Sequence, residues 1–462
     1  MLIDNLKAIV GAGGWMTDAT DLEPHLTEWR ERWTGKTLVM LSPRSTEEVA
    51  AIVLECRQVG AAIVPQGGNT GLCGGAIPDD SGEQVLLSLS RMNKIRSVAP
   101  NDYSIIVDAG CTLASIQAAA ENADRFFPLS LAAEGSCQIG GNLSTNAGGI
   151  NVLRYGTARD QALGLEVVLP DGKIWDGLRA LRKDTSGYDL KQLFIGAEGT
   201  LGVITAACLR LYPALRHAQT ALVALESPDQ AVALLAELRH QLSDQIQAFE
   251  LIPNRAIRYV LRHIPSMRFP DVQESSWYVL LEGMNTGDAE QLEQELMTCL
   301  DAGLITDAVV AKNESEAGEL WRIRHAISEA QKKEGASLKH DISVPVASVG
   351  DFIRIADEAV AKQQPGVRVV AFGHVGDGNI HYNLSQPKGS DPTSFLADRE
   401  AVASVVYEVV DRFGGSISAE HGIGQAKRAH LQRYRSEIEL GLMRTIKVAL
   451  DPQNIMNPGK VI

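Results

Sequence analysis

A chain of 462 residues, with 45% hydrophobic and 22% charged residues, has ordinary globular proportions and is long enough for two or three domains. Its formal net charge of −14 argues against a general partnership with nucleic acid or an anionic membrane, and an anionic substrate would need a local cationic pocket. The N-terminal sequence lacks the basic start and apolar core of a signal peptide, and no run of about 20 apolar residues predicts a transmembrane helix.

Six cysteines are scattered along the sequence without a CxxC pair. This pattern predicts reduced thiols that are neither bridged nor bound to zinc, and a cytoplasmic location. No internal repeat or low-complexity linker interrupts the sequence.

The first clear unit is a strand, a helix and a second strand. Residues 37–42 and 61–65 have the apolar runs of strands. Between them, Ser45 and Glu48 predict a capping box at the start of a helix, and Gly60 predicts its end. The segment therefore reads as a β-α-β unit.

More strands follow in a glycine-rich region that extends to about residue 216. They are predicted at residues 85–89, 104–108 and 164–169, and the last leads into a hairpin at residues 170–172. These elements indicate a mixed α/β domain.

The pattern changes after Pro213 to helices that alternate with strands. Helices are predicted at residues 228–241, 288–301, 398–413 and 436–449, and strands at 219–225, 277–283, 305–311, 367–373 and 379–385. This order favours a second domain of the α+β class around an antiparallel sheet.

Glycine-rich loops are the strongest local signal in the first domain. Gly11 and Gly13 begin a dinucleotide fingerprint, but Met16 stands at its third glycine position and no convincing strand precedes it, which disfavours a nicotinamide cofactor. The loop PQGGNTGLCGG at residues 65–75 can turn successive backbone N–H groups toward an anion, although a surface turn is an equal alternative for this loop alone. Two more such loops, at residues 135–156 and 196–205, together indicate a large cofactor that the backbone approaches closely.

Three motifs, PQGGNTGL, GGN…TNAGG and GAEGTLGVIT, resemble the FAD-binding domain of the vanillyl-alcohol oxidase/p-cresol methylhydroxylase flavoproteins. The resemblance covers nearly the whole chain. Within this superfamily, the sequence is similar to the FAD-dependent D-2-hydroxyacid dehydrogenases. The resemblance implies an α+β fold with a two-part FAD-binding domain, residues 1–216 and 411–462. An α+β cap domain, residues 217–410, is inserted around an antiparallel sheet.

The same resemblance implies where FAD binds. Several members attach FAD covalently through a histidine in the first loop, but this chain has Asn69 in that region, so non-covalent FAD is expected. The pyrophosphate is expected on residues 65–72. The implied FAD contacts are Pro65, Gly67, Gly68, Asn69, Thr70, Gly71, Leu72, Ser136, Gly140, Gly141, Asn142, Thr145, Asn146, Gly148, Glu198, Gly199, Val203, Ile204 and Asn457.

Two histidines beside glycine turns and a later Glu-His pair form a candidate metal and acid-base cluster. His374 and His381 lie in FGHVGDGNIHYNL, and Glu420 and His421 lie in SAEHGIG. Two imidazoles and a carboxylate are a common catalytic set for zinc or manganese, whereas the alternative is that both histidines bond to glycine-turn carbonyls. The resemblance implies that His374, His381 and Glu420 are the ligands of a divalent metal. Zinc is the first choice and manganese the second, although both accept nitrogen and oxygen ligands. The resemblance also implies that His421 is the general base and a substrate contact, and that Asn383 contacts substrate.

This set suits the oxidation of a 2-hydroxy acid. A divalent cation that binds the hydroxyl lowers its pKa, and a nearby imidazole takes the proton near neutral pH. The flavin accepts the hydride.

The segment of residues 319–343 is unusually basic for an acidic chain. Arg324 and Ser328 lie four residues apart and so share a helix face, and Lys339 follows in an extended stretch. The other cations there read as a solvated helix face. The resemblance implies that these three residues grip a substrate carboxylate, with Ser328 where those enzymes carry threonine. The expected substrate is therefore a 2-hydroxy diacid, with D-2-hydroxyglutarate the first choice and D-malate the second.

Three alternatives stay open. A D-lactate dehydrogenase or glycolate oxidase flavin subunit would not need the grip of Arg324 and Lys339 on a second carboxylate. A zinc hydrolase would use the histidines but not three glycine loops. A catalytically silent subunit is disfavoured by the full set of site residues. Because no nicotinamide fingerprint is found, the electrons are expected to leave through a protein or quinone-linked carrier, and the resemblance suggests electron-transfer flavoprotein. The enzyme is expected to be a homodimer.

Overall fold

The structure is a computed structural model that describes residues 2–214, 218–284 and 291–462. The chain forms two compact units. Unit 1 comprises Met1–Gly149, Gly156–Ala214 and Glu420–Ile462, and unit 2 comprises Ile150–Tyr155 and Leu215–Ala419. The chain thus returns to unit 1 at Glu420, against the expected 411, because helix α15 (Arg399–Arg412) and the seven residues after it stay in unit 2. No helix among the described residues is both long and apolar enough to cross a bilayer.

The first sheet of unit 1 has the order β1-β2-β4-β3. Its strands are β1 (Trp15–Met16), β2 (Val39–Leu41), β3 (Ile63–Gln66) and β4 (Val85–Ser88). Helix α3 (Thr46–Val59) joins β2 to β3, which confirms the predicted β-α-β order. Both strands run parallel to β4, which lies between them.

The ends of α3 follow the sequence signals only in part. Ser45 caps the first turn by accepting a hydrogen bond from the Glu48 N–H at 3.3 Å, and Gly60 ends the helix at a φ of 71°. The carboxylate of Glu48, however, accepts the N–H of Arg44 at 2.7 Å and not that of Ser45. The predicted capping box is therefore wrong in its second arm.

The second sheet of unit 1 is antiparallel, with the order β5-β6-β10-β8-β9. It consists of β5 (Ile95–Ala99), β6 (Ser104–Asp108), β8 (Ala162–Val168), β9 (Ile174–Asp176) and β10 (Val203–Arg210), and confirms the predicted hairpin at residues 170–172. The two sheets share one core with α1 (Leu2–Val10), α3 and α4 (Leu113–Glu121). The other α-helices and strands of unit 1 are α2 (Ala19–Leu26), β7 (Arg125–Phe126), α5 (Ile139–Ser144), α7 (Ala158–Gln161), α8 (Lys191–Phe194), β11 (Tyr212–Pro213), α16 (Arg428–Tyr434) and α17 (Glu437–Leu450).

Two glycine segments differ in backbone structure. Helix α1 directly precedes Gly11 and Gly13, whereas a dinucleotide fingerprint needs a strand at this place. The segment at residues 135–156 is partly helical, because it contains α5 and, within unit 2, α6 (Val152–Tyr155).

Unit 2 contains two antiparallel sheets where the sequence predicted one. The four-stranded sheet has the order β13-β14-β12-β15, and the three-stranded sheet has the order β16-β18-β17. The strands are β12 (Ala218–Leu225), β13 (Ile246–Pro253), β14 (Trp277–Met284), β15 (Asp307–Val310), β16 (Ser337–Ser343), β17 (Arg368–Phe372) and β18 (Asn379–Ser385). A bridge between Leu251 and Gly373 joins the edges of the two sheets.

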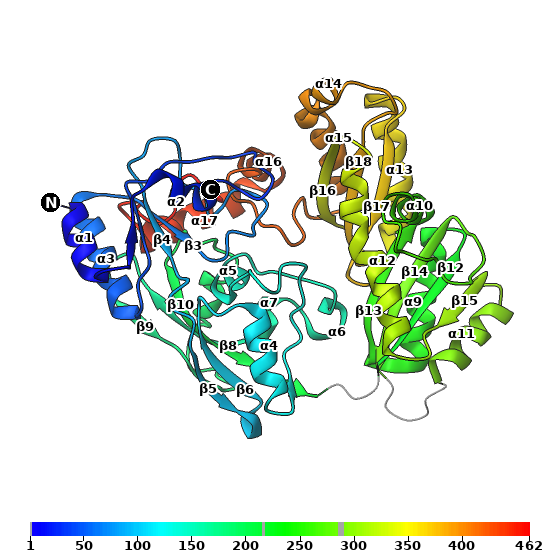
Figure 1. The fold of residues 1–462 in the computed structure, drawn as a ribbon, viewed down its shortest axis with the longest axis horizontal. Helices are drawn as coiled ribbons and strands as arrows, with labels where there is room; N and C mark the ends of the chain where they lie inside the picture. The colour runs from blue at the N-terminus through cyan, green and yellow to red at the C-terminus, as the bar shows by residue number, and fades with distance from the viewer. Residues whose placement is uncertain (1, 215–217, 285–290) are drawn as a thin grey trace. The chain divides into compact units, whose positions relative to one another are not determined.

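Helices cover both sheets of unit 2 (Figure 1). They are α9 (Pro228–Leu242), α10 (Asn254–His263), α11 (Gln291–Asp301), α12 (Glu314–Lys332), α13 (Val349–Gln363), α14 (Pro392–Ala397) and α15. The predicted helix at 288–301 is present from Gln291, and its first three residues lie outside the described part.

All six cysteines are buried, and none forms a disulfide bond. Burial raises the pKa of the Cys56 thiol to about 12, which keeps it protonated at neutral pH.

An ion cluster around Glu334 predicts how unit 2 responds to acid. Burial alone would raise the pKa of this carboxyl group, but hydrogen bonds from His263, Arg368 and Arg262 hold its pKa at about 2, below the usual 4.5. A lowered folded-state pKa stabilises the fold above the unfolded value, and this contribution is lost as the pH falls toward 2. We expect Glu334→Gln to be less stable than wild type at about pH 6, with the gap closing below about pH 3.

Urea unfolding across this pH range measures the effect. Glu329→Gln is the matched control because Glu329 is an exposed carboxylate on α12, in an ion pair with Lys333 at 2.9 Å. A gap between wild type and Glu334→Gln that stays constant with pH contradicts the prediction.

Candidate active site

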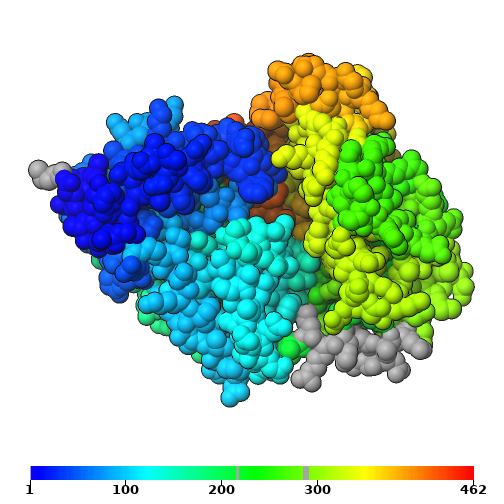
Figure 2. All heavy atoms as spheres, in the orientation of Figure 1, coloured from blue at the N-terminus to red at the C-terminus, as the bar shows by residue number. Residues whose placement is uncertain are grey.

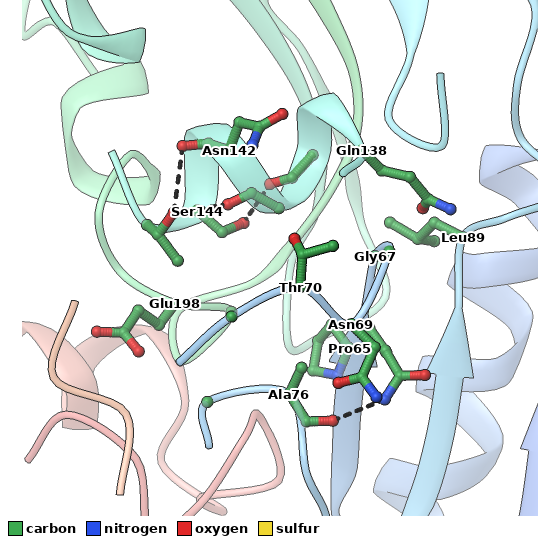
Figure 3. Close-up of a pocket in the computed structure, with 18 of the residues that line it drawn as sticks. Pro65, Gly67, Asn69, Thr70, Ala76, Leu89, Gln138, Asn142, Ser144 and Glu198 are labelled. Atoms are coloured by element: carbon green, nitrogen blue, oxygen red, sulfur yellow. Dashed lines mark hydrogen bonds between the residues drawn. The ribbon is translucent and has the colours of Figure 1, made fainter. Parts of the chain in front are cut away.

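The glycine loops of unit 1 enclose a cavity of about 130 Å³ (Figure 3). Most of the predicted FAD contacts line it, and so does His421. The predicted residues in the lining are Pro65, Gly67, Gly68, Asn69, Thr70, Gly71, Gly140, Gly141, Asn142, Thr145, Glu198, Gly199, Val203 and Ile204. Lining residues that are not among the predicted FAD contacts are Gln66, Cys73, Gly75, Ala76, Leu89, Cys137, Gln138, Ser144 and Gly202.

Five predicted FAD contacts do not line the cavity and instead support the segments around it. The Asn146 side chain accepts the N–H of Arg159 at 3.0 Å, and that of Asn457 donates to the Glu198 carbonyl at 2.7 Å. The Leu72 carbonyl accepts a hydrogen bond from Arg32, and the Ser136 hydroxyl donates one to the Ala133 carbonyl. The fifth residue is Gly148. These five residues were predicted from the resemblance, which does not separate lining residues from supporting ones.

Glycine has two distinct uses at this cavity. A Cβ on Gly68 would lie 1.9 Å from the Ser136 carbonyl oxygen, so this glycine lets the first two loops pack together. A Cβ on Gly71 or on Gly141 would meet nothing within 4 Å. These two positions therefore leave space at the cavity, as a flat ligand needs.

Two buried acceptors at the cavity lack protein donors. Gln138 Oε1 and Asn142 Oδ1 are buried and accept no hydrogen bond from the residues that the structure describes. Figure 3 shows both side chains beside the cavity, from the α5 side. Unsatisfied buried acceptors are costly, and the N–H and hydroxyl groups of a flavin dinucleotide are donors that fit them.

Asn69 stands where a covalent attachment would require histidine. Its backbone is left-handed, with a φ of 52°, and its side-chain amide donates to the carbonyls of Pro24 at 3.1 Å and Thr27 at 3.0 Å. The side chain thus anchors the loop to α2 and offers no nucleophile.

Glu198 connects the third glycine loop to the segment that carries His421. Its carboxylate accepts the backbone N–H groups of Ile423 at 2.7 Å and Gly424 at 2.8 Å. Burial raises the pKa of this carboxyl group, although these two hydrogen bonds act in the opposite direction. The contact fixes the turn after His421 and so holds that imidazole at the cavity wall.

Glu420 lies next to the second glycine loop. A Cβ on Gly148 would approach the Glu420 carboxylate oxygen to 2.7 Å, so glycine leaves room for this side chain. Donor atoms of Glu420 and His421 lie within 4.8 Å of each other. Unit 1 thus places a carboxylate beside the imidazole that lines the cavity.

In unit 2, the strand register gathers four polar residues on one face of the three-stranded sheet. Lys339 is directly opposite Asn383, and Asp341 is directly opposite His381. Because alternate residues of a strand share a face, all four side chains project to the same side. His374, just beyond β17, has a ring nitrogen within 4.8 Å of one of His381.

Helix α12 contributes two residues seven positions apart, Arg324 and Gln331, which share a helix face. The Asn383 amide donates to the Gln331 side-chain oxygen at 3.0 Å, so this face contacts the sheet. The Arg324 guanidinium lies 4.8 Å above the Phe372 ring, and Phe372 is directly opposite His381. The structure therefore brings Arg324 near the polar residues, whereas it leaves the Ser328 side chain exposed.

Glu250, which the sequence did not single out, lies between Arg324 and His374. It is fully buried in β13, with one oxygen 2.6 Å from Arg324 Nε and the other 3.4 Å from His374 Nε2. Complete burial would raise the pKa of Glu250, but the charges of Arg324 and His374 outweigh it, so its pKa is lowered. In the sequence, the only indication of this buried residue was a single acidic side chain within the apolar run AFELIP.

Family models confirm the class that this geometry suggests. The model "FAD binding domain" matches residues 37–177, and "FAD linked oxidases, C-terminal domain" matches residues 214–461. The chain is 38% identical to the D-2-hydroxyglutarate dehydrogenase of Xanthomonas citri pv. viticola, over 99% of this chain and 96% of that protein. It is 39% identical to the mitochondrial D-2-hydroxyglutarate dehydrogenase of Bos taurus, over 99% of this chain and 83% of that protein.

The solved structures give the fold. The crystal structure of p-cresol methylhydroxylase with substrate bound matches with a TM-score of 0.76 and 17% identity, over 100% of this chain and 96% of that one. The chain therefore belongs to the FAD-linked oxidases of the vanillyl-alcohol oxidase/p-cresol methylhydroxylase type and, among them, to the FAD-dependent D-2-hydroxyacid dehydrogenases.

Proposed function

We propose that this enzyme oxidises D-2-hydroxyglutarate to 2-oxoglutarate, with D-malate as a second substrate. The observation that carries the proposal is the polar sheet face of unit 2, where Lys339 and Asn383 stand directly opposite each other beside His381. Arg324 adds a second cation close to that face. Two cations near two imidazoles suit a substrate with two carboxylates. The similar dehydrogenases of Xanthomonas citri and Bos taurus support the choice of acid.

Within this proposal, Arg324 orients the substrate through its terminal nitrogens. Its Nε is already used by Glu250 at 2.6 Å, which leaves Nη1 and Nη2 for another acceptor. A guanidinium held on one side in this way presents a preorganised fork to a carboxylate. Lys339 and Asn383 add a charge and an amide, and Ser328, being exposed, contributes only at the rim.

FAD is proposed to bind non-covalently along the glycine loops, where Gln138 and Asn142 offer buried acceptors and Asn69 offers no nucleophile. Bound there, the flavin supplies the acceptor for the hydride from C2 of the substrate. His421, which lines the same cavity, takes the proton from the substrate hydroxyl.

A divalent cation, zinc before manganese, is proposed to be held by His374, His381 and Glu420. The two imidazoles have ring nitrogens within 4.8 Å of each other, which suits shared coordination. The Ala419 N–H donates to the Asp341 carbonyl at 3.4 Å, and Asp341 is paired with His381. Glu420 is the next residue in the chain, so connectivity favours it as the third ligand. The cation would lower the pKa of the substrate hydroxyl.

An electron-transfer flavoprotein or a quinone-linked carrier is proposed as the final acceptor. The nicotinamide alternative is disfavoured because helix α1 precedes Gly11, where a dinucleotide fingerprint requires a strand.

Steady-state kinetics with an artificial electron acceptor test the substrate assignment. We expect kcat/KM for D-2-hydroxyglutarate to exceed that for D-lactate by more than about tenfold, since a second carboxylate engages charged donors. D-malate is expected to lie between them. Equal efficiency on D-lactate or glycolate would favour a D-lactate dehydrogenase or glycolate oxidase subunit instead.

A further inference from the structure

A further cavity, of about 730 Å³, lies in unit 2, and its lining shares no residue with the candidate active site. It is lined by α10, α13, β17 and the adjoining strand ends. Asp357 is the only acidic residue in its lining. The basic residues of the lining are Arg255, Arg258, Arg262, Arg368 and Lys388.

The outer edge of strand β17 borders this cavity. It is the last strand of the sheet β16-β18-β17. The Gln386 N–H, at the end of β18, donates to Ala336 on the β16 side at 3.0 Å. Backbone groups alternate in direction along a strand, so every second residue of β18, counted back from Gln386, points toward β16. Val369 and Ala371 are directly opposite such residues and therefore direct their backbone groups away from β18. Both residues line the cavity.

Proline explains why the neighbouring sheet does not cover this edge. Gly373 and Leu251 exchange two backbone hydrogen bonds, at 2.8 Å and 3.0 Å, which begins a ladder between β17 and β13. The next pair in this register would be Ala371 and Pro253. Proline has no N–H, and α10 begins at Asn254, so the ladder ends after one pair.

A movable side chain covers part of the edge. Arg255 Nη1 donates to the Val369 carbonyl at 2.8 Å, and the Arg255 side chain is otherwise exposed. Charged side chains commonly protect strand edges in this way. An incoming peptide N–H can replace this contact, which frees the guanidinium for an acidic side chain.

The cavity wall keeps positive charge in spite of its ion pairs. Arg258 is paired with Glu274 at 2.5 Å, but both side chains are exposed, so the pair is weak. Arg262 and Arg368 share the single carboxylate of Glu334, which leaves this group with a net positive charge. Lys388 is exposed and forms no ion pair with any residue that the structure describes. Helix α10, which carries three of these arginines, lies on the visible surface in the space-filling view (Figure 2, green). In a chain of net charge −14, such a wall selects an anionic partner.

We propose that the cavity binds an extended, acidic segment of another protein, which adds as a strand to the edge of β17. The half-buried Val369 supplies main-chain pairing at the accessible part of the edge, whereas Ala371 is 2% exposed, and Lys388 with the arginines of α10 supplies charge selection. A small anion alone would leave the strand edge unused. The proposal does not depend on the oxidation reaction.

Fluorescence anisotropy with the full chain tests this proposal. The probe is a labelled, acetylated and amidated hexapeptide of alternating valine and glutamate. Its controls are the same peptide with lysine for glutamate, a version N-methylated at alternate residues, and inorganic pyrophosphate. We expect the glutamate peptide to bind, and hydrogen exchange to slow in the segment at residues 367–372. The lysine and N-methylated peptides are expected not to bind.

Two variants connect binding to the site. Lys388→Glu is expected to weaken the glutamate peptide by about fivefold or more. Val369→Pro removes an outward N–H at an edge position and leaves the β18 ladder intact, so it is expected to abolish protection. Thermal unfolding confirms that each variant is folded.

Several results would overturn the proposal. Equal binding of the glutamate and lysine peptides excludes charge selection, and binding of the N-methylated peptide excludes strand addition. Pyrophosphate binding without any glutamate-peptide binding identifies a small-anion site instead. No binding by any probe also rejects the acidic-segment proposal.

Discussion

Replacing His381 by alanine is expected to lower the affinity for the divalent metal at least about 100-fold and to abolish measurable turnover of D-2-hydroxyglutarate. The reason is that two imidazoles, with ring nitrogens within 4.8 Å, supply two of the three proposed ligands. His381 stands on β18, paired with Asp341, so the change leaves the strand register intact.

Metal content by mass spectrometry and flavin content by absorbance are measured together on this variant. The expected result is lost metal with retained FAD, because the glycine loops lie in unit 1. His240→Ala is the control, since His240 is exposed on α9. A His381→Ala protein that keeps its metal and its turnover would reject the ligand assignment.

The second large effect is expected from the buried pair of Arg324 and Glu250. Arg324→Ala alone leaves a fully buried carboxylate without its 2.6 Å partner, which costs about 3–5 kcal/mol of stability. The double variant Arg324→Met with Glu250→Gln removes both charges at similar volume and so is expected to fold. In this variant kcat/KM for D-2-hydroxyglutarate is expected to fall about 10- to 100-fold more than that for D-lactate.

Glu250→Gln by itself separates positioning from binding. It keeps the Arg324 guanidinium but removes the charge that holds its Nε. We expect KM for the diacid to rise more than kcat falls, measured with metal in excess because Glu250 also lies 3.4 Å from His374. An equal loss on D-lactate and on the diacid would show that the pair supports the fold and does not select substrate.

Much of the fold could be predicted because local signals were strong. The cap at Ser45, the end at Gly60 and the strands around the Gly376 turn depend on neighbouring residues, and the structure has them there. The division of the cap region into two sheets was not predictable, because it depends on where the β13 ladder ends, at Pro253.

The candidate site divides in the same way. The pairing of His381 with Asp341 follows from strand register, which sequence alternation indicates but does not fix. Glu250 was missed because it lies 74 positions before Arg324, and the contact exists only in three dimensions. Ser328 lies four residues after Arg324 on α12, and this spacing predicted a shared helix face. Ser328 is nevertheless exposed, because it lies at the border of the buried face.

An anaerobic visible spectrum of the purified enzyme tests the central claim most directly. The flavin bands are expected to bleach within one turnover when D-2-hydroxyglutarate is added, and much more slowly with D-lactate at equal concentration. Bleaching by D-lactate as fast as by the diacid would contradict the assigned substrate. A protein that binds FAD but is bleached by neither acid, even with zinc or manganese added, would contradict the proposed reaction.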